Sequence, residues 1–373
     1  MNALSYLNDL IFFGLLAAML GCGTLKKETY DEDTDTGTDT TEDTASSDGD
    51  ADAGDGGDDR GPGRQNDLVG VNLSGAEFGS EVPGVLTVSY IFPKPESLDY
   101  FLDKGMNVFR IPFLWERMQR ELYGALFDRD LSHLKDLVTA ATDRGAYAIL
   151  DPHNYARYND RLIGAEIDDA AFADFWARLA AEFMDDDHVI FGLMNEPHDM
   201  ETEQWFASAT AATAAIRETG AENLILVPGN GWTGAHSWGA SYYGTSNQEA
   251  FSAYEDPGGN FAIEVHQYLD SDSSGTHTTC VSETVGVERL ESITAWAEEG
   301  NYRLFLGELG ADATDLCMTA VDNTLGYVGD HSDVWLGWSW WSAGPWWGGY
   351  FMSIEPDEEM GDKPQMATLE RHL

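Results

Sequence analysis

Eight apolar, strand-like runs alternate with helical patterns after Leu68, and this alternation predicts a (β/α)₈ TIM barrel. Several of these runs are apolar without alternation, which is typical of parallel strands that are buried on both faces. Eight β/α units in roughly 300 residues also fit the size of one such barrel. The expected strands are Val69–Ser74, Val108–Phe113, Tyr147–His153, Val189–Glu196, Asn223–Gly229, Phe261–Tyr268, Leu304–Glu308 and Trp335–Trp341.

Helical patterns fill most of the intervals between these runs. We expect Asp130 and Asp169 to be helix N-caps, and Gly105, Gly145 and Gly220 to stop helices at their C-terminal ends. The interval after the fifth run has only a weak helical pattern and looks mostly like loop. The expected helices are Leu98–Lys104, Leu131–Arg144, Ala170–Met184, Glu201–Glu218, Val287–Glu299 and Thr314–Tyr327.

An open, doubly wound sheet is the alternative arrangement for alternating strands and helices. That fold commonly places a glycine-rich phosphate loop after its first strand. Here the first run ends in Asn72–Gly75 (Asn-Leu-Ser-Gly), which is not such a loop. The barrel is therefore the predicted fold, and we assign it to residues 67–373.

Two further segments precede this domain. Residues 1–22 contain the apolar run Ile11–Gly21, which is too short to span a bilayer and fits the core of a signal peptide. Residues Met19–Cys22 (Met-Leu-Gly-Cys) resemble a bacterial lipoprotein cleavage box and predict lipidation of Cys22, with a plain secretory signal or a buried cytosolic helix as alternatives. Residues 23–66 are rich in Asp, Thr, Gly and Ser and predict a disordered acidic linker, because they cannot bury enough apolar surface.

The formal net charge of −46 argues against a nucleic-acid partner, because the chain would repel phosphates. We predict an exported monomer that is an outer-membrane or cell-surface lipoprotein, or else a secreted protein. Its only membrane contact would be the lipid anchor at Cys22. Two cysteines remain in the predicted barrel, Cys280 and Cys317, and export favours a disulfide between them over a metal site.

Polar or aromatic candidate side chains stand at or near the ends of six of the eight expected strands. In a barrel these ends meet on one face, where active sites lie. Taken singly, Arg110 could be an ion-pair partner, and the histidines and aromatic residues could belong to the core. Their shared position instead favours an active site with two glutamates. The candidates are Arg110, His153, Asn195, Glu196, His266, Tyr268, Glu308 and Trp341.

Other kinds of chemistry lack their sequence patterns. A metal-dependent hydrolase would need a His-x-His or similar ligand cluster, and a serine hydrolase would need a Gly-x-Ser-x-Gly elbow. Neither pattern is present, and no cofactor fingerprint is visible, so we expect no metal and no cofactor. Two strand-end glutamates in a chain with 12 tryptophans match the requirements of glycoside hydrolysis.

Four segments resemble glycoside hydrolase family 5. Residues Val189–His198 (Val-Ile-Phe-Gly-Leu-Met-Asn-Glu-Pro-His) resemble its signature. Residues Asp151–Tyr158, Val265–His277 and Gly307–Gly310 are similar to the branch that holds fungal and bacterial endo-β-1,4-glucanases. The resemblance implies a retaining enzyme that cuts internal β-1,4 bonds of cellulose or related β-glucans without a cofactor. It also implies that Cys280 pairs with Cys317.

In a retaining mechanism we expect Glu196 to be the acid/base, with a pKa raised by burial and by a neighbouring carboxylate, and Glu308 to be the nucleophile. Arg110 would hold Glu308 ionised, and Tyr268 would donate a hydrogen bond to it. The remaining candidates would bind the sugar or orient the carboxylates. Asn195 would grip a 2-hydroxyl group, His153 and His266 would orient hydroxyl groups and carboxylates, Trp341 would form the floor, and Trp232 would be a further stacking platform.

Two other functions stay open. A related β-glycanase acting on mannan, xyloglucan or mixed-linkage glucan would use the same catalytic parts. A noncatalytic glycan-binding lipoprotein that kept the barrel is the alternative from another class, although both glutamates are present. No carbohydrate-binding module accompanies the predicted domain, so the sequence leaves action on crystalline cellulose undecided.

Overall fold

The computed structural model describes residues 67–357 and 361–373. The predicted signal peptide, Cys22 and the predicted acidic linker, which together make up residues 1–66, lie outside the described residues. Among the described residues, no helix combines the length and the apolar character needed to cross a membrane.

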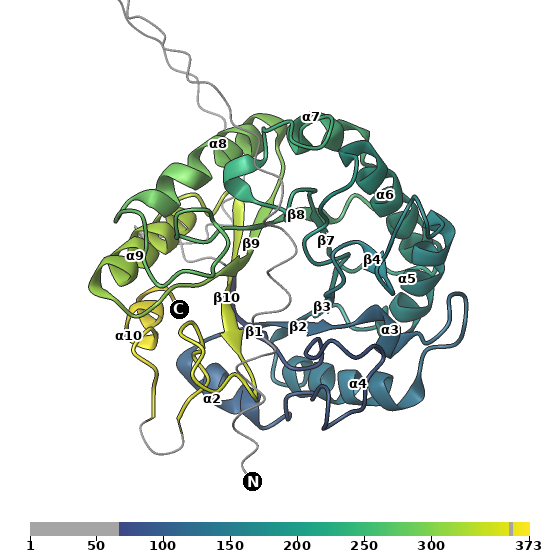
Figure 1. Cartoon of the computed structure of the whole chain (residues 1–373), viewed down its shortest axis with the longest axis horizontal. Coiled ribbons are helices and arrows are strands. Elements are labelled where there is room, and N and C mark those ends of the chain that lie inside the picture. Colours follow the sequence, from purple (N-terminus) through teal and green to yellow (C-terminus); the bar gives the residue numbers. More distant parts are fainter. Residues whose placement is uncertain (1–66, 358–360) are drawn as a thin grey trace, which may run out of the picture. The chain divides into compact units, whose positions relative to one another are not determined.

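Eight parallel strands close into a barrel, and this confirms the predicted fold (Figure 1). The strand order around the barrel is β1-β10-β9-β8-β7-β6-β3-β2. A separate antiparallel hairpin, β4 (Arg157–Tyr158) and β5 (Arg161–Leu162), lies in the loop after β3. The barrel strands are β1 (Leu68–Leu73), β2 (Val108–Phe113), β3 (Tyr147–Pro152), β6 (Val189–Gly192), β7 (Ile225–Pro228), β8 (Phe261–His266), β9 (Leu304–Leu309) and β10 (Trp335–Ala343).

Helices surround the barrel on its outside (Figure 1). The interval that was expected to be loop after the fifth strand contains only short helices, in agreement with its weak pattern. The longer helices are α2 (Ser97–Lys104), α4 (Asp128–Thr142), α5 (Asp169–Phe183), α6 (Thr202–Glu218), α8 (Val285–Gly300) and α9 (Asp315–Asp330). The short ones are α3 (Trp115–Met118), η3 (Ala235–Ser237), α7 (Asn247–Ala250), η4 (Phe251–Ala253), α10 (Met366–Leu369) and η5 (Glu370–His372).

Both predicted N-caps were wrong by one to three residues. Asp130 lies in the first turn of α4 and is fully buried, where its carboxylate accepts a hydrogen bond of 2.7 Å from the Tyr90 hydroxyl. Asp169 is the first residue of α5, and Asp168 occupies the N-cap position. The predicted stop at Gly105 is confirmed, because this residue caps α2 in the left-handed conformation with φ of 103°.

The barrel interior changes from apolar to polar along its axis. One apolar layer takes a residue from seven of the eight strands near their N-terminal ends. It consists of Leu68, Val108, Ile149, Ile190, Leu226, Ala262 and Phe305. Side chains alternate between the two faces of a strand, so the residue two positions later points into the barrel again. On β2, β3 and β8 that residue is Arg110, Asp151 and Glu264, so the next layer is charged.

A disulfide joins Cys280, in the loop after β8, to Cys317 in the first turn of α9. Their Cα atoms lie 5.3 Å apart, and both side chains are buried. The predicted pairing is therefore confirmed. It fastens a long loop at the C-terminal end of the barrel to the helix layer.

Candidate active site

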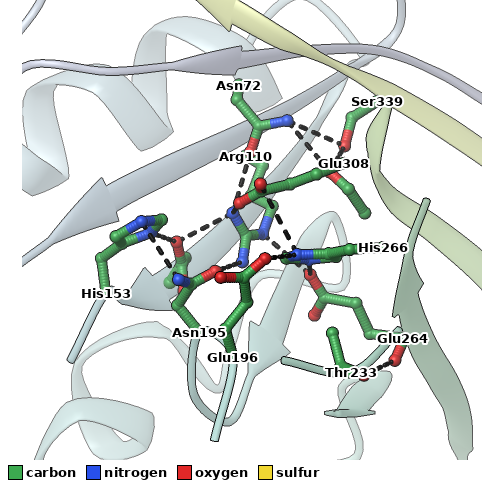
Figure 2. Close-up of polar contacts among 12 residues, drawn as sticks. Asn72, Arg110, His153, Asn195, Glu196, Thr233, Glu264, His266, Glu308 and Ser339 are labelled. Atoms are coloured by element: carbon green, nitrogen blue, oxygen red, sulfur yellow. Dashed lines mark hydrogen bonds and ion pairs between the residues drawn. The ribbon is translucent and has the colours of Figure 1, made fainter. Parts of the chain in front are cut away.

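Arg110, on β2, lies at the centre of the charged layer inside the barrel (Figure 2). Its guanidinium group is buried and contacts side chains from five other strands or strand ends. These contacts of 2.9–3.0 Å reach Asn72 Oδ1, Asp151 Oδ2, Asn195 Oδ1, Glu264 Oε1 and Glu308 Oε1. Burial alone lowers the pKa of Arg110, but Asp151, Glu264 and Glu308 raise that pKa above its ordinary value. Arg110 is therefore a permanent cation that orients the groups around it.

Glu308, near the end of β9, is held by two donors. Its Oε1 accepts from Arg110 Nη1 at 3.0 Å, and its Oε2 accepts from the Tyr268 hydroxyl at 2.6 Å. His266 Nδ1 lies 3.5 Å from the same Oε2. A cation and a hydroxyl donor therefore fix both oxygens of Glu308 in position, as an attacking nucleophile requires.

Glu196 comes after a strand that is shorter than predicted. The sequence predicted a strand to Glu196, but β6 ends at Gly192, and Glu196 has a left-handed backbone with φ of 41°. The side chain of Glu196 is 15% exposed, against 5% for Glu308, so its carboxyl group faces the open end of the barrel. Burial and the charge of Glu308 raise the pKa of Glu196, although a hydrogen bond from His266 opposes this shift.

His266, the last residue of β8, lies between two carboxyl groups. Its Nδ1 donates to Glu196 Oε1 at 2.7 Å, and its Nε2 donates to Glu264 Oε1 at 3.2 Å. Burial lowers the pKa of His266, but Glu308, Glu196 and Glu264 outweigh burial and raise it to about 10. The imidazole is therefore protonated on both nitrogens and can donate to both carboxylates at once.

Asn195 is fixed through both ends of its amide group. Its Oδ1 accepts from Arg110 Nη2 at 2.9 Å, and its Nδ2 donates to His153 Nε2 at 3.1 Å. His153 Nδ1 in turn donates to Asp151 Oδ2 at 2.8 Å, which sets the tautomer of the ring. An amide nitrogen carries two hydrogens, so Asn195 retains one N–H for a ligand.

Two neighbouring tryptophans of β10 have different surroundings. Trp340 is fully buried, and its indole N–H donates to the carbonyl of Met352 at 2.8 Å. Trp341 is partly exposed and stacks on His153, with ring centroids 5.4 Å apart and an angle of 18° between the rings. Of this pair, Trp341 is therefore the one with an indole face open to a ligand.

Trp232 lies apart from this network, in the loop after β7. It is 42% exposed, and its backbone N–H donates to the carbonyl of Pro197 at 3.0 Å. The predicted platform is therefore joined to the loop that carries Glu196. The other predicted active-site residues belong to the hydrogen-bonded network around Arg110, except Trp341, which stacks on His153.

The sequence interpretation missed three buried members of this network. Asp151 and Glu264 each form an ion pair with Arg110, and Asn72 accepts from it. The signal was present, because Asp151 and Glu264 stand two positions before His153 and His266 on the same strands. Residues spaced by two share a face, so a carboxylate two residues before a site histidine was a candidate partner.

The carboxyl groups of Glu196 and Glu308 lie close together. One carboxyl oxygen of Glu196 and one of Glu308 lie within 4.8 Å of each other and of a His266 ring nitrogen. Oxygens this close are compatible with the separation of about 5–5.5 Å between the carboxyl groups of retaining glycosidases. Both ring nitrogens of His266 already have carboxyl partners, Glu196 and Glu264, so this trio offers a metal no free imidazole nitrogen.

Residues 71–344 match the model of the cellulase family, glycosyl hydrolase family 5. The chain belongs to this family. The match covers the barrel from β1 to the end of β10, and it confirms the resemblance that residues Val189–His198 carried.

Several members of family 5 are similar to this chain over most of its length. Probable endo-β-1,4-glucanase B of Aspergillus kawachii (strain NBRC 4308) is 41% identical over 320 residues, which cover 84% of this chain and 94% of that protein. The solved structure of the endo-β-1,4-glucanase Xac0029 from Xanthomonas axonopodis pv. citri matches with a TM-score of 0.80 and 48% identity, covering 82% of this chain and 98% of that one. The solved structure of Pseudomonas stutzeri endoglucanase Cel5A in complex with cellobiose matches with a TM-score of 0.75 and 33% identity. The match covers 83% of this chain and 94% of that one.

Proposed function

We propose that this chain is a retaining endo-β-1,4-glucanase in which Glu308 is the nucleophile and Glu196 is the acid/base. One observation carries the proposal. Two carboxyl groups have oxygens within 4.8 Å of each other. Glu308 is held by Arg110 and Tyr268, and the pKa of Glu196 is raised. The names of the relatives support a β-1,4-glucan as the substrate.

In the first step, an oxygen of Glu308 attacks the anomeric carbon of the sugar at the cleavage point. The glycosidic bond breaks, and the proton of Glu196 moves to the oxygen of the departing chain. Glu308 becomes an ester and loses its negative charge. Arg110 stabilises Glu308 before the reaction without titrating itself, because its pKa is raised by the carboxylates around it.

The second step reverses the role of Glu196. The negative charge of Glu308 is one cause of the raised pKa of Glu196, and that charge is absent in the glycosyl-enzyme. The pKa of Glu196 therefore falls when it must act as a base. Water attacks the anomeric carbon, gives its proton to Glu196 and releases Glu308 as a carboxylate.

The other predicted residues would act on the substrate or hold the glutamates. Asn195 has one free N–H for a 2-hydroxyl group. His153 and Trp341 stack on each other, so the exposed indole face of Trp341 would form the floor under the reacting sugar. Tyr268 and His266 hold Glu308 and Glu196 through hydrogen bonds.

Release of reducing sugar from a small panel of polysaccharides tests the activity and the substrate class. We expect the fastest release on carboxymethylcellulose, slower release on mixed-linkage glucan and xyloglucan, and the slowest on mannan, whose 2-hydroxyl group has the opposite orientation at Asn195. The matched control is Glu308→Ala, which should release none. Activity on mannan alone would point to the related β-glycanase, and no release by the wild type would point to the noncatalytic glycan-binding lipoprotein.

We also propose that the chain is an exported monomer, anchored through Cys22 and a linker over residues 23–66. The disulfide between Cys280 and Cys317 supports an oxidising compartment. Expressed in a Gram-negative host, the wild type should partition into a detergent phase, and Cys22→Ser should move it to the aqueous phase. Identical partitioning of the two proteins would contradict a lipid anchor at Cys22.

A further inference from the structure

His198 lies flat beneath Trp232. The two ring centroids are 4.5 Å apart, and the angle between the rings is 8°. The side chain of His198 is 19% exposed, whereas Trp232 is 42% exposed. Because the imidazole covers one face of the indole, the exposed surface of Trp232 belongs to the opposite face and to the ring edge.

Both nitrogens of His198 have partners, which fix the plane of its ring. Nδ1 donates to Asp199 Oδ2 at 2.9 Å, and Nε2 accepts from Arg157 Nη1 at 3.4 Å. Arg157 also donates to the His198 carbonyl at 3.3 Å. The Tyr243 hydroxyl donates to the second oxygen of Asp199 at 2.9 Å. His198 therefore forms a rigid support rather than a mobile surface side chain.

The backbone under Trp232 is fixed as well. Trp232 and Thr233 both have left-handed φ angles, of 57° and 47°. Thr233 secures this turn, since its hydroxyl donates to the Glu264 carbonyl at 2.6 Å and accepts from the Gly229 N–H at 2.8 Å. The Trp232 N–H donates to Pro197, the residue directly after Glu196. The indole and the proposed acid are thus parts of one connected pair of loops.

We propose that His198 is a positioning residue for the departing part of the substrate. It holds the indole of Trp232 in one plane, so that a sugar stacked on the free face presents its glycosidic oxygen to Glu196. This inference rests on the proposed function. The departing sugar is the one bonded to the oxygen that Glu196 protonates, and Trp232 is on the loop joined to Glu196, whereas Trp341 is placed beside His153. A stacking contact contributes only if the ring is already in position.

Two substrates with different leaving groups test this role. Cellopentaose departs as a sugar chain that can stack on Trp232, whereas β-cellobiosyl fluoride releases fluoride, which cannot. We expect His198→Ala to lower kcat/KM for cellopentaose about tenfold and to leave kcat/KM for the fluoride within about twofold of the wild type. His198→Phe keeps a flat ring and should recover most of the loss. The matched control is His236→Ala, since His236 contacts Gln267 in the same region and should change neither rate.

A double-mutant cycle shows whether His198 acts through Trp232. In a Trp232→Ala background, His198→Ala should cause no further loss on cellopentaose. An equal loss on both substrates, a further loss in that background, or no loss on cellopentaose would each overturn the positioning role. A wild type that fails to turn over β-cellobiosyl fluoride would instead contradict the proposed function itself, so the two failures are distinguishable.

Discussion

Glu196 and Glu308 have the same side chain, and their surroundings set them apart. Glu308 accepts from Arg110 and from Tyr268, and it is nearly buried. Glu196 accepts from His266, faces the open end of the barrel and has a raised pKa because of burial and of the nearby Glu308. This difference in environment supports the proposed division of roles, with Glu196 in proton transfer and Glu308 in covalent chemistry.

At the residue scale, we expect His266→Gln to move the basic limb of the pH profile. Glu196 must be protonated to act as the acid, so kcat/KM falls as the pH rises through its pKa. The protonated His266 lowers that pKa, and its removal should raise the pKa of Glu196 and shift the basic limb to higher pH, together with a loss of rate. Rates on carboxymethylcellulose across a pH series measure this shift.

The control for this shift is Tyr268→Phe. Tyr268 contacts Glu308 and not the proposed acid, so its removal should lower the rate and leave the basic limb in place. A basic limb that moves to lower pH in His266→Gln would mean that His266 does not act on Glu196 as a cation.

At the element scale, charged side chains from several strands lie in one layer inside the barrel, because residues spaced by two lie on the same face of a strand. Arg110, Asp151 and Glu264 are each two positions beyond a residue of the apolar layer on their strands. The glycine on β9 at the same level, Gly307, makes room for this layer. A Cβ atom there would lie 2.2 Å from Glu264 Oε1 and 2.8 Å from its Cδ.

Gly307→Ala should therefore destabilise the fold and lower activity together. Its methyl group must displace Glu264, which breaks the contacts of this carboxylate with Arg110 and His266 inside the barrel. Breaking a buried ion pair costs about 3–5 kcal/mol. Urea unfolding measures the loss in the free energy of unfolding.

The matched control is Gly326→Ala, in the interior of α9. There the added Cβ has its nearest neighbour, His372 Cε1, at 4.0 Å. Alanine in a helix is favoured over glycine by about 0.5–1 kcal/mol, so this variant should be neutral or slightly more stable. Equal stability of Gly307→Ala and the wild type would contradict the role assigned to the polar layer.

The sequence predicted the strands well and the network between them less well. Val108–Phe113 was predicted at its observed bounds, and the other barrel strands were mostly predicted within two residues. These strands are buried on both faces, so each forms an apolar run that is visible in the sequence. The prediction placed the end of β6 too far along the chain. Leu193 and Met194 are apolar and buried like the strand residues before them, although the strand ends at Gly192. Glu264 was missed, although His266 two positions later is one of its partners, because its other partner, Arg110, is far from it in the sequence. Only the closed barrel brings it to Arg110.

At the scale of the whole molecule, family membership and the closed barrel agree with the sequence prediction over residues 71–344. The disulfide is the covalent link between the substrate face and the helix layer, and it spans 37 residues of sequence. Export, the anchor at Cys22 and the monomeric state stay predictions, because they depend on residues or partners outside the described chain.

Replacing both cysteines, as Cys280→Ala with Cys317→Ala, should lower the free energy of unfolding by about 2–4 kcal/mol. The cross-link restricts the unfolded chain, and its loss leaves the folded active site in place. Urea unfolding of the wild type with and without a reducing agent is the control, since the reduced wild type should match the double variant. Free thiols at both positions in the exported protein would contradict this prediction.

The division of labour between the two glutamates is the central claim, and azide rescue tests it most directly. Glu196→Ala should still form the glycosyl-enzyme from dinitrophenyl cellobioside, whose leaving group needs no proton, and should then stall because no base activates water. Azide needs no base, so it should restore turnover and yield the β-azide, the retained anomer. Glu308→Ala should form no glycosyl-enzyme. Recovery of the β-azide from Glu196→Ala is the predicted result, whereas rescue of Glu308→Ala to the β-azide, with none for Glu196→Ala, would show that the two roles are reversed.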